Sequence, residues 1–182
     1  GNIPILLVAC HAGSDKPSDI LDRPLAETKN LPDVFTDKLI EEIVSSLNAF
    51  GLKPSAIIMG ISRVKIDLND PPELAYCSPG RGEDVYKKFH SIISSISETN
   101  QNKYGWSLLI DIHGFLARDS HLALQKDIIL GTNNGSSMPI ENGEKMTRRS
   151  FELLLSKKGW QLYPNGSKVE DIFPGGYIIR NH

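Results

Sequence analysis

The stretch IPILLVAC, residues Ile3–Cys10, decides the fold because it is a continuous run of apolar side chains. An uninterrupted apolar run of this length predicts a strand that is buried on both faces, as in a parallel sheet. A second run, WSLLIDI at Trp106–Ile112, has the same character. Both runs are too short to cross a bilayer, so we predict that they are strands of one sheet.

Amphipathic helices separate these runs. Residues Val34–Phe50 and Glu83–Ser97 carry apolar side chains at helical spacing, with Asp33 at the N-cap position of the first helix. Weaker patterns predict strands at Pro54–Ile61, Val64–Leu68 (continuing or pairing with the preceding strand), Asp127–Leu130, Trp160–Tyr163 and Gly176–Ile179, and a helix at Gly143–Lys157. This alternation indicates an α/β fold with three layers, a mixed but mostly parallel sheet flanked by helices.

The composition is that of an ordinary globular protein. Of 182 residues, 40% are hydrophobic and 23% are charged, and the formal net charge is −2. No run of Lys or Arg stands out, which argues against nucleic acid or an acidic membrane surface as the main partner. The length favours a single domain over residues 1–182, with two small domains as the less favoured alternative.

His11 and His113 directly follow the two apolar runs. Ligands of open α/β sheets bind outside the carboxyl ends of the strands, so two such loops can bring both rings to one ion. Imidazole is a common zinc ligand, and a catalytic zinc takes three protein ligands and a water. Asp15 and Asp33 are the candidates for a carboxylate ligand on the His11 side. Asp111 points to the same side of its strand as His113 and is placed to hold that ring through a hydrogen bond.

These residues also have structural interpretations. A single histidine after a strand is more often a hydrogen-bonded structural residue, and Asp33 alone is more often an N-cap. His90 falls within the second helix and is expected to pack or face solvent. Cys10 next to His11 resembles a thiol nucleophile beside its base, but adjacent strand residues point to opposite faces, which makes this pairing geometrically poor. Cys10 and Cys77 either form one disulfide or stay reduced.

Six segments resemble, in order, those of the N-formylglutamate amidohydrolase family. They are ACHAG (Ala9–Gly13), similar to the family's S-P-H-S-G; PDVFTDKL (Pro32–Leu39), similar to D-x-x-[TV]-D-x-L; SRVKIDLNDPP (Ser62–Pro72), similar to S-R-x-V-I-D-L-N-R-P-P; LLIDIHGF (Leu108–Phe115), similar to D-L-H-S; DIILGTNNGSS (Asp127–Ser137), similar to D-x-x-L-G-T-x-x-G; and GGYIIR (Gly175–Arg180), similar to G-G-Y-[IT]-T-R. The resemblance covers nearly the whole chain, and SRVKIDLN is its most specific piece.

The resemblance implies a zinc-carboxypeptidase-like (phosphorylase/hydrolase-like) fold and a zinc-dependent amidohydrolase. Metal-activated water would attack the amide of a small N-acyl amino acid or a peptide-like substrate. His11 and His113 match the family's metal positions, and Asp33 matches its aspartate at the helix start, with Asp15 as the alternative third ligand. The remaining expected roles are oxyanion stabilisation by Arg63 or Arg180, substrate binding by Asn69, Arg63 and Arg148, and support of the metal ligands by Asp67 and Asp111.

Two departures from the family pattern bear on activity. Asp70 stands where the family has an arginine that would hold a substrate carboxylate. The aspartate reverses the local charge, which disfavours N-formylglutamate itself and favours a neutral or cationic group. The chain also ends at His182, before the strand with the family's general-base glutamate. Either that segment was left out or the protein lacks it, and Glu73 or Glu141 are only weak substitutes. The alternative is therefore a catalytically weak or inactive ligand-binding domain that retains the fold, with or without the metal.

Cellular location has two interpretations. The family resemblance implies a cytoplasmic protein. The chain begins at Gly1 rather than Met, which indicates a processed or trimmed product, and the glycosylation triplets at Asn134 and Asn165 leave a secreted origin open.

Overall fold

A computed structural model gives the fold of the chain. It describes residues 1–24, 31–114, 128–129, 131, 140–141, 144–145, 155–160, 162–163 and 176–182. The chain divides into two compact units, Gly1–Gly114 together with His182, and Phe115–Asn181. Across the described residues, no helix is both long enough and apolar enough to cross a membrane.

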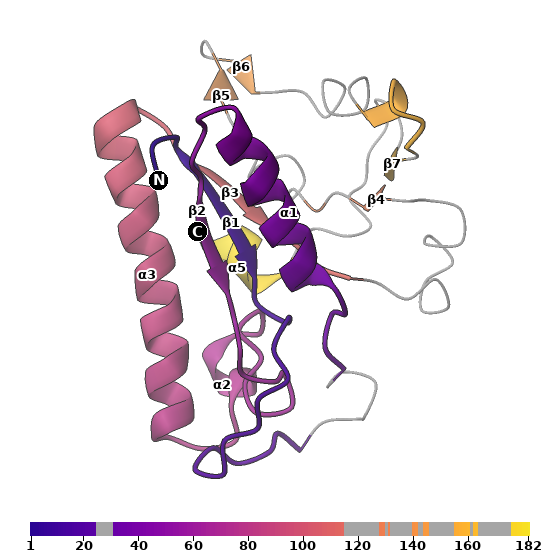
Figure 1. The fold of residues 1–182 in the computed structure, drawn as a ribbon. Coiled ribbons are helices and arrows are strands. Elements are labelled where there is room, and N and C mark those ends of the chain that lie inside the picture. The colour runs from indigo at the N-terminus through magenta and orange to yellow at the C-terminus, as the bar shows by residue number, and fades with distance from the viewer. Residues whose placement is uncertain are drawn as a thin grey trace. The chain divides into compact units, whose positions relative to one another are not determined.

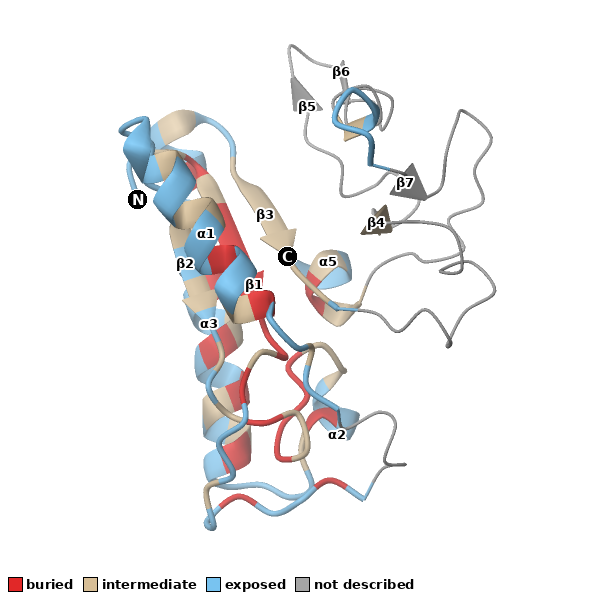
Figure 2. Ribbon diagram, turned by 45° about the vertical axis from the view of Figure 1, so that its right-hand side comes forward, coloured by how far each residue is buried: buried red, intermediate tan, exposed pale blue. Residues whose placement is uncertain are grey.

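The first unit is built on a three-stranded parallel sheet. Strand β1 (Ile5–Ala9) lies in the middle, between β2 (Ser55–Ile58) and β3 (Leu108–Asp111), as Figure 1 shows. Leu6 and Leu7 point to opposite faces of β1 and are both buried. Figure 2 colours the ribbon by burial, and most of β1 is buried. The predicted central strand, buried on both faces, is therefore confirmed.

Helices cover this sheet. Helix α1 (Thr36–Ala49) and helix α3 (Arg81–Tyr104) lie on either side of the strands (Figure 1). Leu7 packs against Ile40 of α1 in the apolar core, and Ile93 of α3 is fully buried. The first unit is thus an α/β arrangement of a parallel sheet flanked by helices, and both predicted helices are confirmed.

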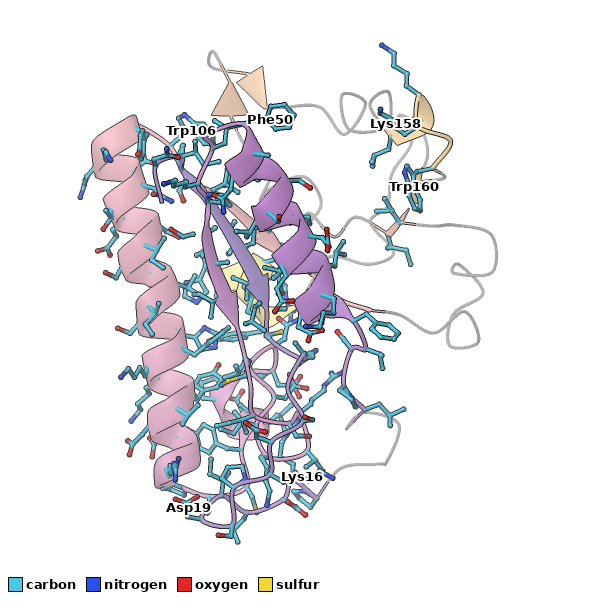
Figure 3. All side chains as sticks on the ribbon, viewed as in Figure 1. Lys16, Asp19, Phe50, Trp106, Lys158 and Trp160 are labelled. Carbon is cyan, nitrogen blue, oxygen red and sulfur yellow. The ribbon has the colours of Figure 1, made fainter. Side chains whose placement is uncertain are left out.

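The order of the strands marks a position for a site. The chain leaves β1 through α1 to β2 and returns through α3 to β3, on the other side of β1. Such a reversal creates a crevice outside the carboxyl ends of the two strands that flank it, here β1 and β3. In Figure 3, Phe50 and Trp106 mark the end of the first unit where β3 begins, and Lys16 and Asp19 mark the opposite end, beyond the carboxyl ends of the strands.

The second unit contains short elements. They are β4 (Ile128–Ile129) and β7 (Leu162–Tyr163), which pair in parallel, β5 (Ile140–Glu141) and β6 (Glu144–Lys145), which pair antiparallel, and α5 (Tyr177–Asn181). The predicted helix at Gly143–Lys157 is wrong at its start, where β6 lies, and most of it falls outside the described residues. The predicted strand at Gly176–Ile179 is also wrong, because Tyr177–Asn181 is helical.

Two further expectations fail in the first unit. Val64–Leu68 forms no strand but turns back on itself, with the backbone N–H of Lys65 donating to the carbonyl of Ser62. The short helix α2 (Pro72–Ala75) follows. Asp33 is not the N-cap of α1, because the helix begins after Phe35, which adopts a left-handed conformation with φ 67°. The side chain of Asp33 is therefore available for other contacts.

Candidate metal centre

His11 lies directly after β1 and is held from one side by a carboxylate. The ring is 2% exposed, and its Nε2 donates to Oδ1 of Asp67 at 2.7 Å. The next turn of chain passes so close to the segment after β2 that a Cβ on Gly13 would lie 2.2 Å from the carbonyl of Gly60. The glycine of the ACHAG segment is therefore needed to bring the chain after His11 against the loop that carries Asp67.

His113 follows β3, the strand beside β1, so the two rings meet at the predicted crevice. Their centroids are 4.8 Å apart in an edge-to-face arrangement with an interplanar angle of 65°. His113 Nδ1 donates to Oδ2 of Asp33 at 2.8 Å, and its Nε2 donates to Oδ2 of Asp111 at 2.8 Å. The Nδ2 of Asn69 also lies 3.1 Å from that Nε2. Both nitrogens of the ring thus face polar side chains.

Asp33 lies between the two histidines. Its Oδ2 is 2.8 Å from Nδ1 of His113 and 3.4 Å from Nδ1 of His11. Its backbone N–H donates to the carbonyl of His11 at 3.0 Å, and its carbonyl accepts the hydroxyl of Thr36 at 2.8 Å. The backbone contacts fix Asp33 at the entry to α1, so the carboxylate is positioned by the same loop that starts the helix.

Asp67 connects His11 to two arginines. Its Oδ2 accepts from Arg63 Nε at 2.6 Å and from Arg23 Nη1 at 3.2 Å. Arg23 is almost fully buried, and its Nη2 donates to Oδ2 of Asp70 at 2.6 Å. The negative charge of Asp70, the residue that departs from the family pattern, is therefore balanced within the protein by Arg23.

The charges of the cluster shift the pKa values of its members. Burial lowers the pKa of His11, but the charge of Cys10 and hydrogen bonds with carboxylates outweigh burial and raise that pKa well above its ordinary value. Burial also lowers the pKa of His113, and Asp111 and then Asp33 outweigh it, so that this pKa is raised too. Burial would raise the pKa of Asp33, yet hydrogen bonds with both histidines hold it below its ordinary value. The carboxylates thus favour positive charge at the rings, whether a proton or a metal cation.

The cluster offers donors that suit a metal. His11 Nδ1 is buried and faces Oδ2 of Asp33 at 3.4 Å. Nδ1 of His113 faces the same carboxylate. On the other side, the donor atoms of Cys10, His11 and His113 all lie within 4.8 Å of one another. Two imidazoles with a carboxylate or a thiol make the nitrogen, oxygen and sulfur set that zinc prefers.

Two of the other predicted site residues, Asp15 and Glu73, lie in the first unit. Asp15 is exposed, and its backbone pairs with Gly60 and Ser62; within the described residues it forms no ion pair with either histidine. Glu73 is exposed on α2. The rest belong to the second unit. Arg180 lies in α5, where its Nε donates to the carbonyl of Gly176, and Glu141 lies in β5. Arg148 lies outside the described residues.

Two residues of the cluster were not predicted as site residues from the sequence. Arg23 lies in a polar loop with no motif around it, and only the fold brings it to Asp67. Cys10 was set aside because adjacent strand residues alternate, but β1 ends at Ala9, so the alternation does not extend to it. Its Sγ lies 3.7 Å from Nε2 of His113. Both cysteines are free, Cys10 buried and Cys77 exposed.

Comparison with known proteins gives one informative likeness. The chain is similar to the N-formylglutamate deformylase of Pseudomonas putida, with 26% identity over 214 aligned positions that cover all of this chain and 75% of that protein. No protein-family model matches the chain. No solved structure matches it.

Proposed function

We propose, from the likeness to a deformylase and from the geometry of the cluster, that this chain is a zinc-dependent amidohydrolase that cleaves the amide of a small N-acyl amino acid or a peptide-like substrate with water. The observation that carries this proposal is the carboxylate of Asp33, which faces Nδ1 of His11 at 3.4 Å and Nδ1 of His113 at 2.8 Å. The parallel sheet flanked by helices is compatible with the carboxypeptidase-like fold that we propose for residues 1–182 as one domain.

The donor set fits a catalytic zinc. Two imidazole nitrogens and a carboxylate make three protein ligands, the number that leaves one position for water. The outward Nε2 atoms of His11 and His113 are bonded to Asp67 and Asp111, at 2.7 Å and 2.8 Å. Carboxylates in this position fix the orientation of ligating rings and raise their basicity. A bound zinc would lower the pKa of its water and polarise the substrate carbonyl.

Substrate contacts are proposed for residues beside the cluster. Asn69 approaches Nε2 of His113, and its backbone N–H donates to Asp67 at 2.9 Å. Arg63 is bonded to Asp67 through Nε, while its side chain keeps 25% exposure, so it remains our candidate for contact with an anionic group. Asp70 is paired with Arg23 and supplies no positive charge for a substrate carboxylate. We therefore propose that the substrate's side chain is neutral or cationic.

A second candidate is a ligand-binding domain with weak or no catalysis. The observation that favours it is that Glu73, a candidate general base, does not contact the cluster. Glu73 is exposed on α2 and, among the described residues, makes no hydrogen bond or ion pair with the cluster. A metal site without a positioned base would lose roughly 10²–10⁴-fold in rate.

The test is a zinc-reloading experiment on the whole chain. Metal-stripped protein is assayed for bound zinc after reloading, then for hydrolysis of N-formylglutamate, neutral and cationic N-acyl amino acids, and short peptides. We expect stoichiometric zinc and chelator-sensitive turnover that His113→Ala abolishes. Failure to take up zinc would refute the metal site. Zinc uptake without turnover of any substrate would favour the binding domain.

A further inference from the structure

Cys10 approaches the ring nitrogen of His113 that does not face Asp33. The residue is fully buried, and its Sγ lies 3.7 Å from Nε2 of His113. Donors bound to one zinc through bonds of roughly 2.3 Å for sulfur and 2.0–2.1 Å for nitrogen lie about 3.5 Å apart in a tetrahedral arrangement. The observed spacing is therefore suitable for two ligands of one ion, and His11 supplies a third donor within 4.8 Å of both.

A buried atom without a hydrogen-bond partner gives a second observation. Oδ1 of Asp111 is buried and makes no hydrogen bond among the described residues, and the Asp111 side chain is 1% exposed. Buried polar atoms without a partner are rare in folded proteins, and a bound ion is one of their ordinary explanations. The other oxygen of Asp111 lies on the same Nε2 of His113 that Cys10 approaches, so this side of the ring carries a carboxylate as well as a thiol.

The two nitrogens of His113 point in diverging directions, so one ion bound through Nε2 does not use Nδ1. We propose that Cys10 Sγ, His113 Nε2 and His11 form a second, thiol-bearing metal position that takes a thiophilic divalent cation such as Cd(II). Thiolates select such cations, and the thiol proton leaves to solvent on binding. The inference deepens the proposed function and rests on its metal site, because an ion at Cys10 competes with Asp33 for His113. The family segment has proline here, so the resemblance does not imply a thiol ligand.

The test is a Cd(II) titration of metal-free protein followed by ultraviolet difference absorption, which reports cadmium–thiolate bonds. The exposed Cys77 is first removed, so that Cys77→Ser is the parent protein. It is compared with Cys77→Ser/Cys10→Ser and Cys77→Ser/Cys10→Ala. We expect a charge-transfer band that saturates at one equivalent of Cd(II) in the parent and is absent from both double variants.

The outcomes separate this inference from the proposed function. Cd(II) binding by the parent without a thiolate band, or an unchanged band without Cys10, would overturn the thiol-bearing position and leave the Asp33 site standing. A thiolate band in a protein that hydrolyses no N-acyl amino acid would uphold the ligand and count against the hydrolase. If the folded parent binds neither Cd(II) nor zinc, both proposals fail.

Discussion

The first unit holds two pairs of histidines whose rings lie at nearly the same separation but in different surroundings. In the cluster, His11 and His113 are 4.8 Å apart, and carboxylates face their nitrogens. On α3, His90 stacks on His182 with centroids 5.0 Å apart and an interplanar angle of 10°. His90 Nδ1 and His182 Nε2 form a hydrogen bond of 2.8 Å, and Tyr86 lies beside His90.

The comparison shows that the neighbouring side chains decide in which direction the pKa values of a histidine pair shift. The carboxylates raise the pKa values of the cluster pair in spite of burial. At His90, burial and then the second imidazole lower the pKa to about 4, and a hydrogen bond with the Leu68 backbone and the charge of Asp111 compensate only in part. The surroundings of the first pair therefore favour positive charge on the rings, and those of His90 favour a neutral ring.

The largest expected contrast is in zinc binding. His11→Ala removes a donor that is buried between Asp33 and Asp67, so we expect loss of stoichiometric zinc. His182→Ala removes the equivalent member of the other pair and should leave zinc binding unchanged. Equilibrium dialysis of both variants against zinc measures the contrast. Equal loss in both variants would show that the two pairs act together, and equal retention would show that the ion lies elsewhere.

The next effect is on stability, because only the cluster pair is tied to a buried charge network. Asp67→Asn leaves Arg23, whose side chain is 1% exposed, with weaker compensation. Removing one partner of a buried ion pair costs about 3–5 kcal/mol, so we expect a loss of that order in urea denaturation of metal-free protein at pH 7. Asp19→Asn, which breaks the exposed pair with Arg81, is the control and should change little. A similar cost for both would mean that burial does not matter here.

These contrasts bear on what could be foreseen from the sequence. The long apolar run at β1 and the amphipathic patterns of α1 and α3 were predicted correctly, because burial on two faces or on one stripe leaves a strong signal. The short runs Val64–Leu68 and Gly176–Ile179 were predicted wrongly. Apolar stretches of four or five residues fit a strand, a turn or a helix equally well, and tertiary contacts decide between them.

The candidate site was foreseen in part. Strand-end positions alone singled out His11 and His113, and the structure brings the two rings together. For Asp33, local sequence favours a helix cap, whereas the left-handed Phe35 starts the helix later and leaves the carboxylate to the histidines. Arg23 was not foreseen, since its contacts join segments more than 40 positions apart in the chain. Their metal-binding and catalytic roles remain predictions.

A smaller effect on zinc affinity is expected from Asp111, whose carboxylate accepts from Nε2 of His113. Asp111→Asn keeps the size of the side chain but removes the charge that accepts from Nε2 at 2.8 Å. Loss of such a supporting carboxylate typically weakens metal binding by about 10–100-fold, so we expect a rise of that size in the zinc dissociation constant. Competition with a chromophoric chelator measures it. Unchanged affinity would imply that Asp111 does not support a ligating ring.

The smallest expected effect is on how stability depends on pH, where His90 of the second pair should act in the direction opposite to the cluster pair. The pKa of His90 falls to about 4 in the fold from about 6.5 in an unfolded chain. Between these values the unfolded state binds a proton that the folded state does not, so His90 destabilises the fold as the pH falls from 6.5 towards 4. The cluster pair, with raised pKa values, has the reverse sign, since its contribution to the stability of the fold is present below pH 6.5 and is lost as the pH rises through the folded-state pKa values.

His90→Gln should therefore reduce the drop in melting temperature between pH 7 and pH 4.5, measured by circular dichroism of metal-free protein. An identical drop in the variant and the parent would mean that His90 is not kept neutral by its surroundings, and the contrast between the two pairs would then lie in geometry alone.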